Sequence, residues 1–178
     1  MTNSPPITET GGPSVIAAAP TSIALFVGWT SSGPTDEAVR IANFADYEAT
    51  LGKLDDPRSL LGYAVGHFFD NGGTDAYALR IVGGNGDTIM PTEAAFVQTL
   101  NAAFTGGGPI DRIETFNLIC VPGLTDAAAI ATLQAKAVAR RAFLIADCAE
   151  NATVATVPAS LPAITGANAT NSALYFPF

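Results

Sequence analysis

Residues 21–82 contain the strongest indication of the fold class, and they read TSIALFVGWTSSGPTDEAVRIANFADYEATLGKLDDPRSLLGYAVGHFFDNGGTDAYALRIV. It begins with an unbroken apolar run at residues 23–28, which is typical of a central strand with both faces buried. It ends with a second apolar run at residues 76–82, which predicts a second strand. Two strands joined through a helix form a βαβ unit, in which the strands are parallel and the crossover is right-handed.

The segment between these two strands carries a helix pattern. Asp56 followed by Pro57 predicts a helix cap with proline at the first helical position. Asn71 and the glycines after it predict the end of the helix, because glycine adopts the left-handed conformation that closes a helix. A shorter helix is expected to start at Phe44. The apolar stripe of the longer helix consists of Leu60, Leu61, Ala64, Val65, Phe68 and Phe69.

The rest of the chain repeats this alternation. Helices are expected to follow caps at Thr92 and Thr125, and residues 151–170 are expected to form a loop with one short helix. Further strands are expected at residues 116–121, 142–146 and 173–176. Strands that alternate with helices predict an α/β fold over residues 21–178, with an open, mostly parallel sheet and helices on both faces.

Residues 1–20 are expected to form an extended N-terminal arm. The arm is rich in proline and glycine, which remove backbone donors and raise the entropic cost of ordering. It therefore cannot fold by itself. We expect its apolar patch to become ordered by adding to the sheet of a neighbouring subunit. The residues of this predicted assembly segment are Val15, Ile16, Ala17, Ala18 and Ala19.

The composition excludes one class of function and favours another. The chain has a net charge of −8 and only two lysines, Lys53 and Lys136, so it lacks the basic cluster that nucleic-acid binding requires. Only 13% of its 178 residues are charged, while 48% are hydrophobic. A surface with so little charge is typical of a subunit packed inside an assembly. Every apolar run is too short to span a membrane.

A small set of polar residues is a candidate for chemistry. Cys120, Asp126 and Asp147 are expected near the carboxyl ends of parallel strands, where α/β enzymes place ligand-binding groups. However, Asp126 is also expected to stabilise the first turn of a helix, which explains it without chemistry. His67 is expected at the edge of the apolar stripe, and no nucleophile motif accompanies it. We therefore assign no catalytic, cofactor or metal residues and expect no enzymatic activity.

Several short pieces of sequence occur in a characteristic order. They are Phe26-Val27-Gly28, Ser31-Ser32-Gly33-Pro34, Phe44-Ala45-Asp46-Tyr47, Asn71-Gly72-Gly73, and residues 116–123, 140–147 and 173–177. In that order, the chain resembles the N-terminal half of the tail sheath proteins of contractile phages and related injection machines. The resemblance covers most of residues 21–178.

The resemblance implies a structural subunit of a contractile tail sheath, which polymerises as stacked hexameric rings around an inner tube and drives its injection by contraction. It implies strand exchange between neighbouring subunits. It also implies contacts with the inner tube protein and with baseplate, terminator or cap proteins, in a virion tail or injection particle assembled in the bacterial cytoplasm. Because such proteins continue into a second half, residues 21–178 are expected to be part of a longer chain.

Two other functions stay open. A short sheath-like paralogue would cap or initiate a sheath without contracting. An α/β enzyme or small-ligand binder would use the rim near Cys120, Asp126 and Asp147. Stabilisation by a nucleotide or a divalent metal, lost on Asp147→Ala, would favour the enzyme.

Overall fold

The protein folds around one six-stranded sheet, described in a computed structural model over residues 22–159 and 164–176. The strand order is β2-β3-β1-β4-β5-β6. All neighbouring strands are parallel except β2, which runs antiparallel to β3. The predicted assembly segment 15–19 lies outside the described residues. The strands are β1 Ala24–Gly28, β2 Val39–Ile41, β3 Ala76–Arg80, β4 Leu118–Cys120, β5 Phe143–Asp147 and β6 Ser172–Tyr175.

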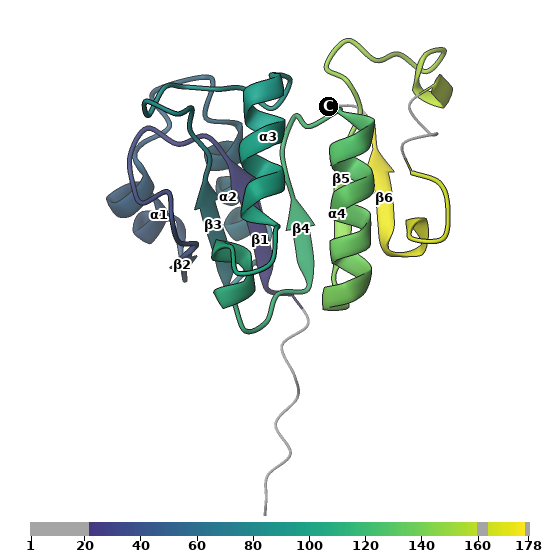
Figure 1. Cartoon of the computed structure of the whole chain (residues 1–178). Coiled ribbons are helices and arrows are strands. Elements are labelled where there is room, and N and C mark those ends of the chain that lie inside the picture. Colours follow the sequence, from purple (N-terminus) through teal and green to yellow (C-terminus); the bar gives the residue numbers. More distant parts are fainter. Residues whose placement is uncertain (1–21, 160–163, 177–178) are drawn as a thin grey trace, which may run out of the picture.

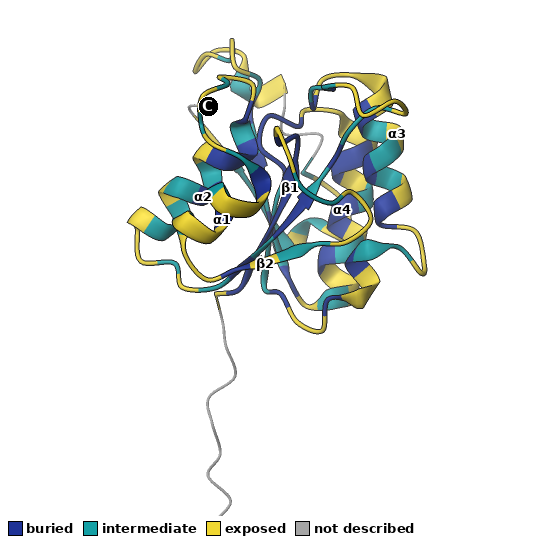
Figure 2. Cartoon of the chain, turned by 90° about the vertical axis from the view of Figure 1, so that its left-hand side faces the viewer, coloured by how far each residue is buried: buried dark blue, intermediate teal, exposed yellow. Residues whose placement is uncertain are grey.

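Helices lie on both faces of this sheet, as the sequence predicted. Figure 1 shows α3 and α4 in front of the sheet, with α1 and α2 behind β1 and β3. Figure 2, turned by 90°, separates the two helical layers on opposite sides of the strands. The helices are α1 Phe44–Leu51, α2 Leu60–Asp70, α3 Ala94–Ala103 and α4 Ala127–Arg140, with short 3-10 turns at η1 Pro109–Arg112, η2 Val157–Ala159 and η4 Ala169–Asn171.

Strand β1 is the centre of the molecule and divides two hydrophobic cores. All five of its residues are buried, as its apolar run predicted. Leu25 and Val27 belong to the core under α3 and α4. Ala24 and Phe26 alternate with them and belong to the core under α1 and α2. This alternation follows from the pleat of a strand, which sends successive side chains to opposite faces.

Strand β2 was not predicted from the sequence. It has only three residues and forms an antiparallel edge beside β3. An exposed ion pair links it to the segment before β3, since the Arg40 guanidinium binds the Asp75 carboxylate at 2.8 Å. Its shortness and its charged residue are features with which natural sheets blunt an edge.

The predicted start of α2 is wrong. The helix begins at Leu60, not after Asp56 and Pro57. The Asp56 carboxylate accepts hydrogen bonds from the backbone N–H and the guanidinium of Arg58, which closes a tight turn before the helix. The Ser59 hydroxyl, at the cap position, contacts the Tyr47 hydroxyl at 3.3 Å instead of a backbone amide. Local bonding within the Asp56–Arg58 turn therefore competes successfully with helix capping.

Two other predicted caps are also displaced by one residue. Asp126, not Thr125, caps α4, because its side chain accepts a hydrogen bond from the Ala129 amide at 2.8 Å. Glu93, not Thr92, precedes α3, and its carboxylate accepts a hydrogen bond from the Met90 amide. The Asp126 carboxylate thus takes the place of the Thr125 hydroxyl and interacts favourably with the positive end of α4. The Glu93 side chain makes no capping hydrogen bond to α3.

The sheet is covered unequally. Along β4 and β5 the residues that face α4 are buried, whereas the alternate residues are only partly buried. In the part of the chain that the structure describes, α1 and α2 pack against the β1 side of the sheet, and no helix lies behind β5 and β6 (Figure 1). One half of the sheet is thus covered on both faces and the other half on one.

Candidate functional site

The carboxyl edge of the sheet is the first place to look for a ligand site. From β1 the chain crosses to β3 on one side, and from β3 it returns past β1 to β4 on the other side. The direction of winding therefore reverses between β1 and β4. Open α/β sheets bind their ligands in the crevice at such a switch point, outside the carboxyl ends of the strands.

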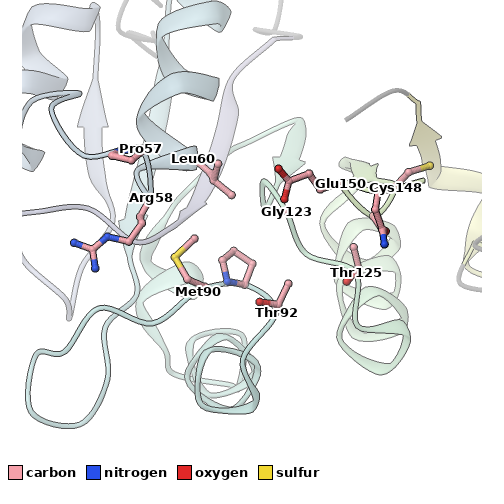
Figure 3. A pocket seen from close by; sticks show the side chains of 12 residues that line it. Pro57, Arg58, Leu60, Met90, Thr92, Gly123, Thr125, Cys148 and Glu150 are labelled. Carbon is pink, nitrogen blue, oxygen red and sulfur yellow. The ribbon is translucent and has the colours of Figure 1, made fainter. Parts of the chain in front are cut away.

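A pocket of about 840 Å³ opens at this edge (Figure 3). It lies between the start of α2, the loop before α3, and the segments that follow β4 and β5. Its lining is mostly apolar, with two threonine hydroxyls and two opposite charges. The lining residues are Pro57, Arg58, Leu60, Met90, Pro91, Thr92, Gly123, Thr125, Cys148, Ala149, Glu150 and Asn151.

The positive charge at the pocket is already paired inside the protein. The Arg58 guanidinium binds the Asp56 carboxylate and holds the pKa of that carboxyl at about 2. The same guanidinium lies over the Trp29 ring, 5.3 Å from the ring centre. These two contacts hold Arg58 in the turn that precedes α2. Because the Asp56 carboxylate neutralises its charge, Arg58 attracts an anionic ligand only weakly.

Cys120 and Asp147 lie close enough to influence one another. Burial, with a smaller effect of the Asp147 charge, raises the pKa of the Cys120 thiol to about 12. Burial also raises the pKa of Asp147, although its carboxylate accepts a hydrogen bond from the Gly123 amide at 3.0 Å. A catalytic cysteine requires the opposite shift, since the thiolate is the nucleophile. Cys120 is therefore held as a thiol at neutral pH.

The other two candidates have structural positions. Asp126 caps α4, and its carboxylate is engaged with the Ala129 amide, so it is not drawn into the Cys120–Asp147 pair. His67 is exposed on α2. In the described ranges no group of three or more metal-binding side chains comes together. No helix there combines the length and hydropathy needed to cross a membrane.

The pocket contains residues that sequence reasoning missed. Arg58, Met90 and Glu150 come from segments far apart in the chain, and none belongs to a motif with fixed spacing. The only available signal was indirect: a doubly wound strand order predicts a crevice at the switch point. To predict that strand order, one must know that β4 lies beside β1 and not beside β3. Helix and strand patterns in the sequence do not give this information.

Comparisons with known proteins give a fold and no sequence family. No family model matches the chain, and no curated protein matches it. Solved structures do match. The anti-feeding prophage helical sheath in its contracted state superposes with a TM-score of 0.61 at 20% identity, covering 98% of this chain and 44% of that one.

Two further structures agree. A chain of the anti-feeding prophage baseplate in its contracted state matches with a TM-score of 0.63 at 21% identity, covering 98% of this chain and 47% of that one. The contracted PVC sheath complex of an extracellular contractile injection system matches with a TM-score of 0.64 at 17% identity, covering 99% and 44%. The fold is that of contractile sheath structures. The chain spans less than half the length of the chains it matches.

Proposed function

We propose that this protein is a structural subunit of a contractile sheath, polymerising as stacked rings around an inner tube and driving its injection by contraction. The fold likeness to contracted sheath structures, over 98% or more of this chain, is the observation that carries the proposal. The likeness was anticipated by the order of short sequence pieces along residues 21–178.

Two properties of the chain support a role as a repeated subunit. Only 13% of its residues are charged, so a large part of the surface can be covered by protein instead of water. The arm at residues 1–20 lacks the composition to fold alone. Strand addition to a neighbour through Val15–Ala19 would satisfy its backbone groups and link subunits while they move.

The proposed partners follow from this role. Copies of the chain contact one another in a helical lattice, and the assembly contacts an inner tube protein, baseplate proteins and a terminator or cap protein. The particle is a virion tail or an injection particle, assembled in the bacterial cytoplasm. Shortening requires no nucleotide or other cofactor, because two lattice packings of unequal free energy suffice to drive it.

Electron microscopy of the assembled protein tests this proposal directly. Wild-type chains are expected to form striated tubes, alone or in the presence of an inner tube. Ile16→Asp combined with Ala18→Asp is expected to abolish the tubes, because buried charges oppose the strand addition that we propose for the arm. The melting temperature should stay unchanged, since the composition of residues 1–20 predicts an arm that does not fold with the rest of the chain. Asn3→Asp combined with Thr8→Asp adds the same charge outside the assembly segment and serves as the control. Normal tubes from the Ile16/Ala18 variant would refute the role of the arm.

A further inference from the structure

One of the six arginines differs from the others in what its side chain contacts. Two of the others form ion pairs with carboxylates, and three donate hydrogen bonds to backbone carbonyl oxygens. These five are Arg40, Arg58, Arg80, Arg112 and Arg140. The side chain of Arg141, which is exposed, makes no hydrogen bond, ion pair or ring contact with any described residue.

Arg141 also has an unusual backbone conformation. It follows the last residue of α4 with φ 53° and ψ 35°, in the left-handed region, and every other described residue with a positive φ is a glycine. Glycine is the usual residue at this position of a helix end, because a Cβ is disfavoured there. Strained residues of this kind concentrate at functional sites. An exposed arginine without a contact in its own chain therefore favours a role in binding another molecule.

The pocket at the carboxyl edge of the sheet presents a negative charge that nothing in its lining neutralises. Arg58 is paired with Asp56, so Glu150 carries the remaining charge of the lining. Glu150 is exposed, and Figure 3 shows its carboxylate directed into the pocket, toward the side of Leu60 and Met90. The walls around this carboxylate are mostly apolar. A cation on a long apolar stem, such as an arginine side chain, fits this combination.

Two further carboxylates add to the negative charge at the rim of the pocket. Glu93 and Asp126 are exposed and directly follow the lining residues Thr92 and Thr125. Each accepts a hydrogen bond from a backbone amide, which leaves its net charge in place. Within the described ranges, neither of them nor Glu150 forms an ion pair. The pocket therefore attracts a cationic side chain and repels an anionic one.

Arg141 and the pocket lie at opposite ends of α4. The helix begins beside the pocket, after Thr125 and Asp126, and ends at Arg140. Its 14 residues span about 21 Å, so Arg141 does not reach the pocket of its own chain. Figure 1 shows α4 running along the strands from the carboxyl edge of the sheet to the opposite edge. A second copy displaced along α4, in the same orientation, brings its Arg141 to the pocket of the first. The same displacement repeats from copy to copy without inversion, as stacked rings require.

We propose that the Arg141 side chain of one copy inserts into the carboxyl-edge pocket of the next copy, with its guanidinium against the Glu150 carboxylate. The inference rests on the proposed function and deepens it, because it names a contact between subunits along the stack. The contact uses a different surface of each copy, so it continues to further copies instead of closing a pair.

The proposed contact depends on one side chain. The edge of the sheet that carries Arg141 is not uniformly basic, because Glu114 is exposed in the segment before β4. Arg141 therefore acts as a single anchor in a pocket, an arrangement that is common at the energetic centre of interfaces. One anchor binds weakly in an isolated pair, and the contact becomes strong when many copies act together.

Exchanging the two charges tests the contact in the full chain, by sedimentation velocity over a concentration series. Arg141→Glu and Glu150→Arg each place like charges against one another and are expected to weaken self-association roughly tenfold or more. The double variant with both changes restores an opposite pair and is expected to associate like the wild type. Lys53→Glu makes the same charge change at an exposed position between α1 and α2, outside the pocket lining, and should leave association unchanged.

Arg141→Gly separates binding from folding. Glycine adopts the left-handed conformation without strain and removes the side chain. The melting temperature is therefore expected to equal or exceed that of the wild type, while self-association weakens roughly tenfold or more. A lower melting temperature with unchanged association would show that Arg141 serves only the fold, and would overturn the inference.

Three other results would also overturn it: a double variant as defective as the single variants, single variants that associate like the wild type, or a wild-type chain that never associates. Electron microscopy distinguishes this inference from the sheath function. If Arg141→Gly and wild type form identical striated tubes, the contact is wrong while the sheath function stands. If the charge exchange behaves as expected but the wild type forms no tubes, the sheath function is wrong.

Discussion

The two halves of the sheet are built from equally apolar strands but are covered differently. In the half around β1 and β3, α1 and α2 cover one face and α3 covers the other, and Phe26 is 5% exposed. In the half around β5 and β6, α4 covers one face, and Tyr175 on the other face is 54% exposed.

The winding of the chain, not the composition of the strands, produces this difference. Right-handed crossovers place a helix on one face when the chain moves outward from β1 to β3, and on the other face when it moves from β3 through β4 to β5. No later crossover in the described chain returns to the first face. The face of β5 and β6 opposite α4 carries no helix for that reason, even though its residues suit a buried environment.

Truncating one phenylalanine in each half gives the largest expected effect. Phe26→Ala removes a ring packed edge-on against Phe68, with centres 5.6 Å apart, and leaves a cavity between sheet and α2. The free energy of unfolding is expected to fall by about 3–5 kcal/mol. Phe143→Ala, on the same face in the open half, is expected to cost about 1–2 kcal/mol, because a partly buried ring loses less burial and leaves no closed cavity. Denaturant unfolding measures both.

Equal costs for these two substitutions would contradict the comparison. They would mean that the face of β5 opposite α4 is already covered in the folded protein. A melting temperature that rises with protein concentration would show that a second copy provides the cover, because association stabilises a protein by mass action.

Glycines in α2 provide a second test, confined to the covered half. A Cβ on Gly62 would overlap the Leu54 side chain and lie 2.5 Å from the Tyr47 hydroxyl, so α1 and α2 could not pack as closely. Gly62→Ala is expected to destabilise the protein by about 1–3 kcal/mol. Gly66→Ala is the matched control one turn later, where the nearest atom, on the Phe44 ring, is 3.4 Å away. It should be neutral or stabilising by up to about 1 kcal/mol, since alanine favours a helix.

The covered half was also the half that the sequence predicted best. The continuous apolar run of β1 and the 3.6-residue stripe of α2 are strong signals, and both elements lie within a few residues of their predicted positions. The start of α2 was placed too early, because the pattern for an N-cap and the pattern for an Asp56–Arg58 turn use the same residue types. β2 was missed because three residues are too few for any periodicity.

The open half was predicted only as strands and a helix. The apolar side chains of Phe143 and Ile145 predict burial, but both are only partly buried. Sequence periodicity identifies an apolar face of a strand and does not indicate whether a helix of the same chain covers it. The candidate site was predicted in part: Cys120 and Asp147 do interact, but Asp126 is turned away by its capping bond. The pocket beside them depends on strand order, which local patterns do not encode. The assembly segment at Val15–Ala19 stays a prediction.

Asp147, at the carboxyl end of β5, provides the smallest expected effect. Burial raises the pKa of its carboxyl above the ordinary value of 3.8. The unfolded chain therefore releases this proton at a lower pH than the folded chain does. As pH rises through 3.8 toward the folded pKa, ionisation lowers the free energy of unfolding, and the loss is complete above the folded pKa.

Asp147→Asn removes that loss and keeps an oxygen that accepts the Gly123 N–H. The variant is expected to be slightly more stable than the wild type at pH 7, and this gain should disappear as pH falls below the ordinary carboxyl range. Parallel denaturant titrations at pH 3 and pH 7 give the difference. The pKa of the Cys120 thiol should also fall, although only in part, because burial and not the Asp147 charge is its main cause. A variant less stable at pH 7 would contradict this prediction. It would show that the hydrogen bond from the Gly123 N–H stabilises the ionised Asp147 carboxylate by more than burial destabilises it.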